Sequence, residues 1–300
     1  MGKAGTGVTS VGSPTVRRRE LGALLRERRI DAGMSVEQVT ERLSCSPSKV
    51  SRMETGHRGV SPRDVRDLCE LYGVTDPVER ERLIALAREG KKQGWWQSFD
   101  LSYGTYVGLE TEAISIRDFE PGVIPGLLQT ASYARALHEN AIPRPTAETI
   151  DQQIKVRTIR QQILFGSEPT RFMAVLDEAV LHRLVGGPAV MAEQLAYVID
   201  ASRRSNIDVR VIPYGAGAHP ALDSTFTLLE LAGPAPGVVV YVEGLVGQIY
   251  LEQPQDVERY KRTFEQLTAT AMSPEESVAL MAVVGARHRE AERPRIDRAG

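Results

Sequence analysis

Residues 17–92 contain five short amphipathic segments, and the residues between them are those that begin and end helices. Three segments begin with a capping side chain followed by proline: Ser46–Pro47, Ser61–Pro62 and Asp76–Pro77. Three segments stop at a glycine: Gly33, Gly56 and Gly73. The second segment begins at Ser35, and Gln38 completes the S-x-x-Q pattern of a capping box. These helix start and stop signals predict an all-α domain of five helices, with the first over about residues 17–32 and the third over 47–55.

Apolar residues recur at helical spacing within these segments, so each helix has one side to bury. The predicted inward positions are Leu21, Leu24, Leu25, Val36, Val39, Leu43, Val50, Met53, Val65, Leu68, Cys69 and Tyr72. Only three or four residues separate the second and third helices. That connection is typical of a helix-turn-helix, whose second helix enters the DNA major groove.

The third helix has a polar face that suits DNA. Arg52 can form a forked pair of hydrogen bonds with guanine, and Ser48 can bond to a base edge. Residues that we expect near phosphates are Ser46, Lys49, Ser51, Arg58 and Arg63. Residues 1–92 carry 18 Lys and Arg against 13 Asp and Glu, a net charge of +5, while the whole chain has −2. The excess favours a nucleic-acid-facing first part.

Residues 21–74 resemble the phage-repressor, or xenobiotic-response-element, type of helix-turn-helix transcriptional regulator. The residues that carry the resemblance are Arg29, Gly33, Ser35, Val50, Ser51, Glu54, Gly56 and Leu68. The resemblance implies that Pro47, Ser48 and Arg52 face bases. It also implies that Arg29 pairs with Glu54 as an internal brace. Thr40 and Ser44 depart from the Ala and Gly that the family prefers, which affects the tilt of the third helix.

A plain helical bundle with a solvated Lys49 and Arg52 is the alternative interpretation of this domain. The basic run Arg17–Arg19 could contact phosphates or form a solvated helix start. Residues 1–16 are rich in Gly, Ser and Thr, and we expect them to be disordered.

Residues 95–285 mix helical and strand patterns. Strand-like runs occupy 171–178, 207–214, 224–231, 236–243 and 247–252. Helical patterns occupy about 150–164, 188–204, 254–271 and 274–291. We expect a multidomain protein whose second part is an α+β domain with a mostly antiparallel sheet of four to five strands. A charged tail over 286–300 would follow it.

This second part resembles a region of uncharacterised function that follows the same helix-turn-helix in many actinobacterial regulators. The resemblance rests on residues 119–137, 175–187 and the strands up to 247–254. It implies a domain that senses a small-molecule effector or binds a small acidic partner protein. Such proteins influence development or antibiotic production.

Candidates for other chemistry are sparse. Glu178 and His182 share a helix face but lack a third ligand, so no metal is predicted. A loop pocket is one interpretation of Tyr214, His219 and Phe226, although a plain connection between strands fits too. Trp95 and Trp96 suit packing better than base stacking. We therefore expect neither a cofactor nor an enzyme.

The chain has no apolar run long enough for a membrane span, no signal-peptide pattern and only two cysteines. These features predict a cytoplasmic protein. The leading hypothesis is a homodimeric regulator that binds double-stranded DNA. The alternatives are an antitoxin-like module that binds a partner and regulates its own expression, and an enzyme with a borrowed DNA-binding domain.

Overall fold

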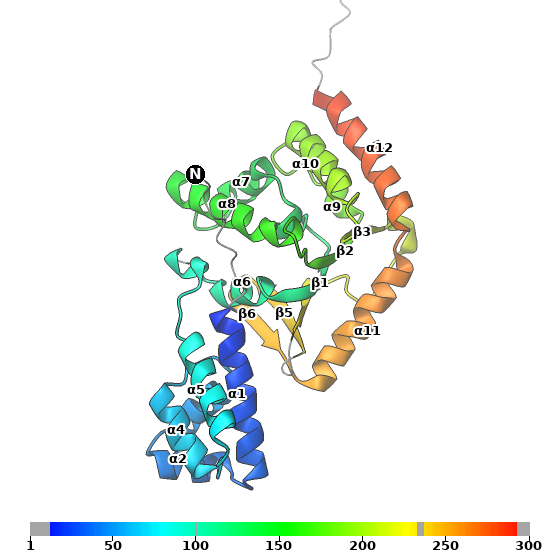
Figure 1. Ribbon diagram of the computed structural model, residues 1–300. Helices are drawn as coiled ribbons and strands as arrows, with labels where there is room; N and C mark the ends of the chain where they lie inside the picture. Colours follow the sequence, from blue (N-terminus) through cyan, green and yellow to red (C-terminus); the bar gives the residue numbers. More distant parts are fainter. Residues whose placement is uncertain (1–12, 100, 233–236, 293–300) are drawn as a thin grey trace, which may run out of the picture. The chain divides into compact units, whose positions relative to one another are not determined.

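The computed structural model describes residues 13–99, 101–232 and 237–292, and its contacts divide the chain into two compact units (Figure 1). The helical unit comprises Met1–Glu112 with Leu231–Gly237, and the sheet unit comprises Ala113–Glu230 with Val238–Gly300. The expected order, an all-α domain followed by an α+β domain, is therefore confirmed.

The helical unit contains the five expected helices. They are α1 (Pro14–Asp31), α2 (Val36–Leu43), α3 (Pro47–Glu54), α4 (Pro62–Leu71) and α5 (Pro77–Glu89). Two short helices follow, η1 (Trp95–Ser98) and α6 (Gly104–Glu110). The Ser35 hydroxyl accepts from the Gln38 N–H at 3.3 Å, and the Gln38 side chain accepts from the Ser35 N–H at 2.8 Å. The predicted capping box is thus formed.

The prediction that residues 1–16 are disordered is wrong for its last part. Ser13 caps α1 through a 3.3 Å hydrogen bond from the Thr15 N–H, and Pro14 is the first helical residue. Residues 13–16 are buried, so packing stabilises this extra turn. Residues 1–12 lie outside the described part of the chain.

The predicted boundary near residue 95 also needs correction. Residues 95–112 belong to the helical unit, because α6 packs on α1. Trp96 is buried and meets Trp95 edge to face, with ring centroids 6.0 Å apart. Both tryptophans therefore contribute to packing within this unit.

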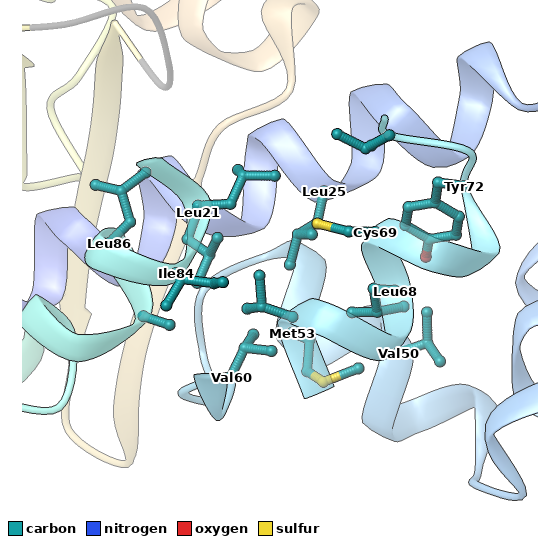
Figure 2. Close-up of a cluster of buried hydrophobic side chains, with 14 of the residues drawn as sticks. Leu21, Leu25, Val50, Met53, Val60, Leu68, Cys69, Tyr72, Ile84 and Leu86 are labelled. Atoms are coloured by element: carbon teal, nitrogen blue, oxygen red, sulfur yellow. The ribbon is translucent and has the colours of Figure 1, made fainter. Parts of the chain in front are cut away.

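One hydrophobic core joins all five of the main helices of the helical unit (Figure 2). Its buried members from α1 to α3 are Leu21, Leu25, Val39, Val50 and Met53, and those from the rest of the core are Val60, Val65, Leu68, Cys69, Tyr72, Val74, Leu83, Ile84, Leu86 and Ala87. Leu24, Val36 and Leu43 pack against it half-buried. The apolar positions chosen from helical spacing all contribute to this core.

The described residues of the sheet unit form one sheet of six strands in the order β3-β2-β1-β4-β5-β6. They are β1 (Ala113–Glu120), β2 (Arg171–Asp177), β3 (Ile207–Ile212), β4 (Phe226–Leu231), β5 (Val238–Gly244) and β6 (Gly247–Leu251). Its helices are η2 (Gly126–Leu128), α7 (Ala131–Glu139), α8 (Ala147–Gln161), η3 (Gln162–Leu164), α9 (Ala179–His182), α10 (Pro188–Ala201), η4 (Tyr214–Ala216), α11 (Pro254–Thr270) and α12 (Pro274–Glu292). Residue 236, where one strand was expected to begin, lies outside the described residues.

The sheet is mixed and mostly antiparallel, as expected, but it contains a sixth strand. That strand is β1, which lies in the interior of the sheet between β2 and β4. β1, β2 and β3 run parallel, and each connection between them passes through helices, as parallel pairing requires. β4, β5 and β6 are joined by antiparallel pairs.

Helices cover the sheet and one of its edges. α11 contributes Val257, Phe264 and Leu267 to a core that includes residues from β1 to β5. At the β3 edge, the Val211 N–H donates to the Ser277 hydroxyl at 3.0 Å and the Val211 carbonyl accepts from the Met272 N–H at 2.9 Å. Residues at and just before the start of α12 therefore occupy both backbone groups of Val211 at that edge.

The charged tail expected over 286–300 begins later than predicted. α12 continues to residue 292, and His288 is buried, with its Nε2 atom 2.9 Å from the Leu181 carbonyl oxygen. Residues 293–300 lie outside the described part of the chain. Within the described residues, none of the helices combines the length and the apolar character that a membrane crossing needs.

Candidate nucleic-acid interface

The turn between α2 and α3 sets the direction of the third helix. Ser44 occupies the left-handed region at φ 49°, where a non-glycine residue is strained. The Cys45 N–H donates to the Thr40 carbonyl at 3.0 Å, and the Thr40 hydroxyl donates to the Glu37 carbonyl at 2.7 Å. The two departures from the family preference are thus accommodated locally. Ser44 adopts the conformation that glycine would supply, and the Thr40 hydroxyl is satisfied within α2.

α3 separates its buried side from a polar outer face. Val50 and Met53 are 1% and 2% exposed, so they fix the helix on the core. The outer face is exposed and consists of Pro47, Ser48, Ser51 and Arg52. All three of the predicted base readers, Pro47, Ser48 and Arg52, are therefore on the side of α3 that DNA could reach.

Arg29 and Glu54 form the expected brace. The Arg29 Nε–H donates to Glu54 Oε1 at 2.6 Å, and a second guanidinium N–H donates to Glu54 Oε2 at 3.0 Å. A third N–H of the Arg29 guanidinium donates to the Met34 carbonyl at 2.8 Å. The pKa of Arg29 is raised, chiefly by the hydrogen bond to Glu54. This forked pair ties the end of α1 to the end of α3 and leaves neither charge for DNA.

The predicted phosphate-binding residues are not equally available. Arg58 and Arg63 are exposed, and neither guanidinium has a hydrogen-bond or ion-pair partner among the described residues. Lys49 Nζ lies 3.7 Å from Asp64 Oδ1. Burial alone would raise the pKa of Asp64, but hydrogen bonds from Ser61 and the charge of Lys49 lower it overall. Lys49 would therefore share its charge between Asp64 and a phosphate.

Ser46 and Ser51 have different local roles. The Ser46 hydroxyl accepts from the Lys49 N–H at 3.2 Å, so it caps α3 and keeps its own O–H to donate. Ser51 is exposed one turn later. A capped helix start offers unpaired N–H groups and a positive dipole end, both of which favour phosphate.

Gly22 positions α3, although the sequence analysis did not single it out. A Cβ atom at this position would lie 2.5 Å from the Met53 carbonyl oxygen and 2.6 Å from that of Glu54. Only glycine allows α1 to approach the end of α3 so closely. The available signal was a glycine inside an amphipathic helix, which is unfavourable unless packing requires it.

The arginine run at the start of α1 is not a solvated helix start. Arg17 lies 2.8 Å from Glu20 and 3.2 Å from Glu89, and Arg19 is 3% exposed. Arg18 is half-buried. The sequence left open phosphate contact or a solvated helix start for these side chains, but α1 begins earlier, at Pro14.

The candidate residues of the sheet unit form small contacts of their own. Glu178 accepts from the Tyr214 N–H at 2.7 Å and lies 3.2 Å from His182, whose ring stacks on that of Tyr214. In residues 13–99, 101–232 and 237–292, no three His, Cys, Asp or Glu side chains come together to hold a metal. His219 Nε2 lies 3.4 Å from Asp177 Oδ2.

The residues of the predicted loop pocket differ in their exposure. Phe226 is 2% exposed and belongs to the core beneath α11, whereas Tyr214 is 58% exposed. His219 is buried and meets Phe119 edge to face, 5.4 Å between ring centroids. Phe226 is thus a packing residue, and a ligand pocket here stays a prediction.

The arrangement of α2, its turn and α3 defines a helix-turn-helix protein. Residues 20–83 match the family of helix-turn-helix domains, and this domain indicates a DNA-binding regulator. Residues 103–282 match the domain of unknown function DUF5753, and the chain belongs to that family. No curated protein and no solved structure matches the chain.

Proposed function

We propose that the protein is a sequence-specific transcription regulator of the xenobiotic-response-element type that reads DNA with α3. The observation that carries the proposal is Arg52. It is exposed on the outer face of a helix that is anchored by Val50, Met53 and the Arg29–Glu54 pair. Its guanidinium has no partner among the described residues, so all of its donors are free for a guanine edge.

The other contacts follow from the same placement. Ser48 would bond to a base, and Pro47, which lacks an N–H, would offer only apolar contact, for example to a thymine methyl group. Ser46, Lys49, Ser51, Arg58 and Arg63 would contact phosphates and fix the register without reading sequence. We assign no catalytic step to either unit and expect the protein to lie in the cytoplasm together with its DNA target.

A single helix-turn-helix buries little surface on DNA, so we propose a homodimer that binds two half-sites. The outer edge of β6 supports this arrangement. β5 is the only strand that neighbours β6 in the described sheet. Ile249 on β6 is 56% exposed, and Leu245 and Val246 at the hairpin tip are fully exposed.

The two edges of the sheet differ in a way that favours self-association through β6. At the β3 edge, both backbone groups of Val211 are already bonded to Ser277 and Met272. β6, with the sequence GQIYL, carries no charge and no proline, the usual devices that prevent edge pairing. Antiparallel pairing with a second copy would bring no like charges opposite each other.

The sheet unit would then set the affinity of the dimer for DNA in response to a small-molecule effector or a protein partner. The fused arrangement of a helix-turn-helix domain and the DUF5753 region supports this role. A stoichiometric small acidic protein that co-purifies with the chain would instead favour the antitoxin-like alternative.

Selection from a random pool of DNA duplexes tests the proposed function. The full chain should enrich a motif with two related half-sites, and Arg52→Ala should lose preference at one position of each half-site. Arg26→Ala serves as the control, because Arg26 is exposed on α1 and the proposal assigns it no DNA contact. Failure of the full chain to enrich any motif, or an unchanged motif with Arg52→Ala, would contradict the proposal.

A further inference from the structure

A small open pocket of about 240 Å³ lies within the helical unit, where the start of α1 meets η1 and α6. Its lining includes Thr15, Arg18, Trp96, Phe99, Ser102 and Thr105. None of these residues belongs to the proposed DNA interface. The pocket therefore calls for an explanation of its own.

Among the described residues that line this pocket, Arg18 alone is ionisable. Its stem packs closely against Gly90, where a Cβ atom would lie 2.8 Å from Arg18 Cγ. One terminal N–H donates to the Thr15 hydroxyl at 3.2 Å. The Nε atom is shielded from solvent and has no hydrogen-bond partner. A guanidinium has five N–H donors, so most of those of Arg18 are unused.

The charge of Arg18 is also uncompensated. Among the described residues no carboxylate lies within ion-pair distance of it, whereas Arg17 beside it pairs with Glu20 and Glu89. The pKa of Arg18 is lowered, first by burial and then by the charge of Arg19. Because burial of an unpaired cation is unfavourable, an anion that reached Arg18 would be bound favourably.

The walls of the pocket restrict the kind of anion. Two aromatic residues, Trp96 and Phe99, line the pocket, together with the hydroxyl-bearing residues Ser102 and Thr105. A volume of about 240 Å³ is below the usual range for drug-sized ligands, so a compact molecule fits best.

We propose that this pocket binds a small organic anion whose carboxylate pairs with Arg18 and whose apolar body contacts Trp96 and Phe99. Arginine suits this role because its planar fork matches a carboxylate with two parallel hydrogen bonds. The site goes beyond the proposed DNA-reading function and makes the helical unit itself responsive to a small molecule.

Intrinsic fluorescence gives a direct readout, since Trp95 and Trp96 are the chain's two tryptophans. The full chain is titrated with acetate, benzoate and the neutral analogue benzamide. Benzoate should give a saturable change and bind more tightly than acetate, because only benzoate can contact the aromatic wall. Benzamide, which lacks the charge, should bind at least about tenfold more weakly than benzoate.

Two variants locate the effect. Arg18→Gln should weaken benzoate binding by about tenfold or more, while Arg26→Gln on the same helix should leave it unchanged. If circular dichroism shows that Arg18→Gln does not fold, Thr105→Leu replaces it. This variant fills the pocket from α6 without changing α1, and it should also weaken benzoate binding. The proposal is overturned if the folded wild type shows no saturable change. Equal binding by the wild type and the folded pocket variant overturns it too, as does displacement of benzoate by duplex DNA at low salt.

Discussion

At the residue scale, two oppositely charged side chains govern the reading helix without facing DNA. Arg29 and Glu54 are 11% and 8% exposed and share two hydrogen bonds. Charge counting alone would assign both to solvent or to DNA. Their geometry shows instead that α3 is fixed at its C-terminal end by an ion pair and along its inner side by Val50 and Met53.

Glu54→Gln should therefore destabilise the protein although Glu54 makes no DNA contact. The variant removes the charged half of the brace and leaves the Arg29 charge buried, which should lower the free energy of unfolding by about 1.5–3 kcal/mol. Urea denaturation measures the change. Glu81→Gln is the matched control, because Glu81 pairs with Arg88 at 3.0 Å on the surface, where such pairs contribute about 1 kcal/mol or less. Equal losses in the two variants would contradict the brace.

Residues on one face of one helix could be predicted from the sequence, and contacts between helices could not. The 3.6-residue period placed Ser48 and Arg52 outward and Val50 inward. The pair between Lys49 and Asp64 joins α3 to α4. No local pattern indicates that contact, because it depends on how the two helices cross.

At the element scale, the close approach of α1 to α3 depends on Gly22, which has no side chain. Gly22→Ala would place a Cβ atom about 2.5 Å from two backbone oxygens, which cannot move without shifting α3. We expect α1 and α3 to separate and stability to fall by about 1–3 kcal/mol, despite the better helix propensity of alanine. Thermal denaturation of Gly22→Ala checks this, with Ala23→Gly as the opposite change on the same helix. A more stable Gly22→Ala would show that the contact is not tight.

The helices were predictable because their signals are local. Ser–Pro and Asp–Pro starts and glycine stops lie within a few residues of each helix end. Ser13 and Pro14 carry the same signature as Ser46 and Pro47. The Gly- and Thr-rich composition of the preceding residues obscured it, so α1 was expected to begin three residues too late.

The strand β1 was missed because its polar residues are satisfied at long range. Its sequence, AISIRDFE, contains Arg117, Asp118 and Glu120 and lacks a clean alternation. Asp118 is 6% exposed and accepts from the Thr227 hydroxyl on β4 at 3.1 Å, from a residue 109 positions away. A sequence window cannot reveal such a partner. Without β1, the parallel half of the sheet could not be inferred either.

At the scale of the whole molecule, the proposed dimer depends on the edge strand β6, which pairs only with β5 in the described sheet. Ile249→Lys should place a charge on that edge and shift the protein from dimer to monomer in sedimentation velocity. Leu222→Lys is the matched control, because Leu222 is 58% exposed on the same unit and Ile249 is 56% exposed. A monomeric wild type, or an Ile249→Lys variant that remains dimeric, would contradict the β6 interface.

The division of the chain into units was only partly predictable. Composition and charge separate a basic helical part from the remainder, but residues 95–112 carry no periodic signal that would assign them. Their place in the helical unit is set by packing of α6 on α1. The pocket at Arg18 depends on the same packing, so neither could be derived from local sequence.

The central claim, that α3 reads base sequence through Arg52, is tested most directly by measuring affinity against salt concentration. The full chain is compared with Arg52→Ala and Arg63→Ala on a selected duplex and on a scrambled one. Arg52→Ala should lose about 1–3 kcal/mol on the selected duplex and far less on the scrambled one. Arg63→Ala should weaken both equally and reduce the salt slope by about one. If Arg52→Ala instead weakens the two duplexes equally, α3 does not read bases through Arg52.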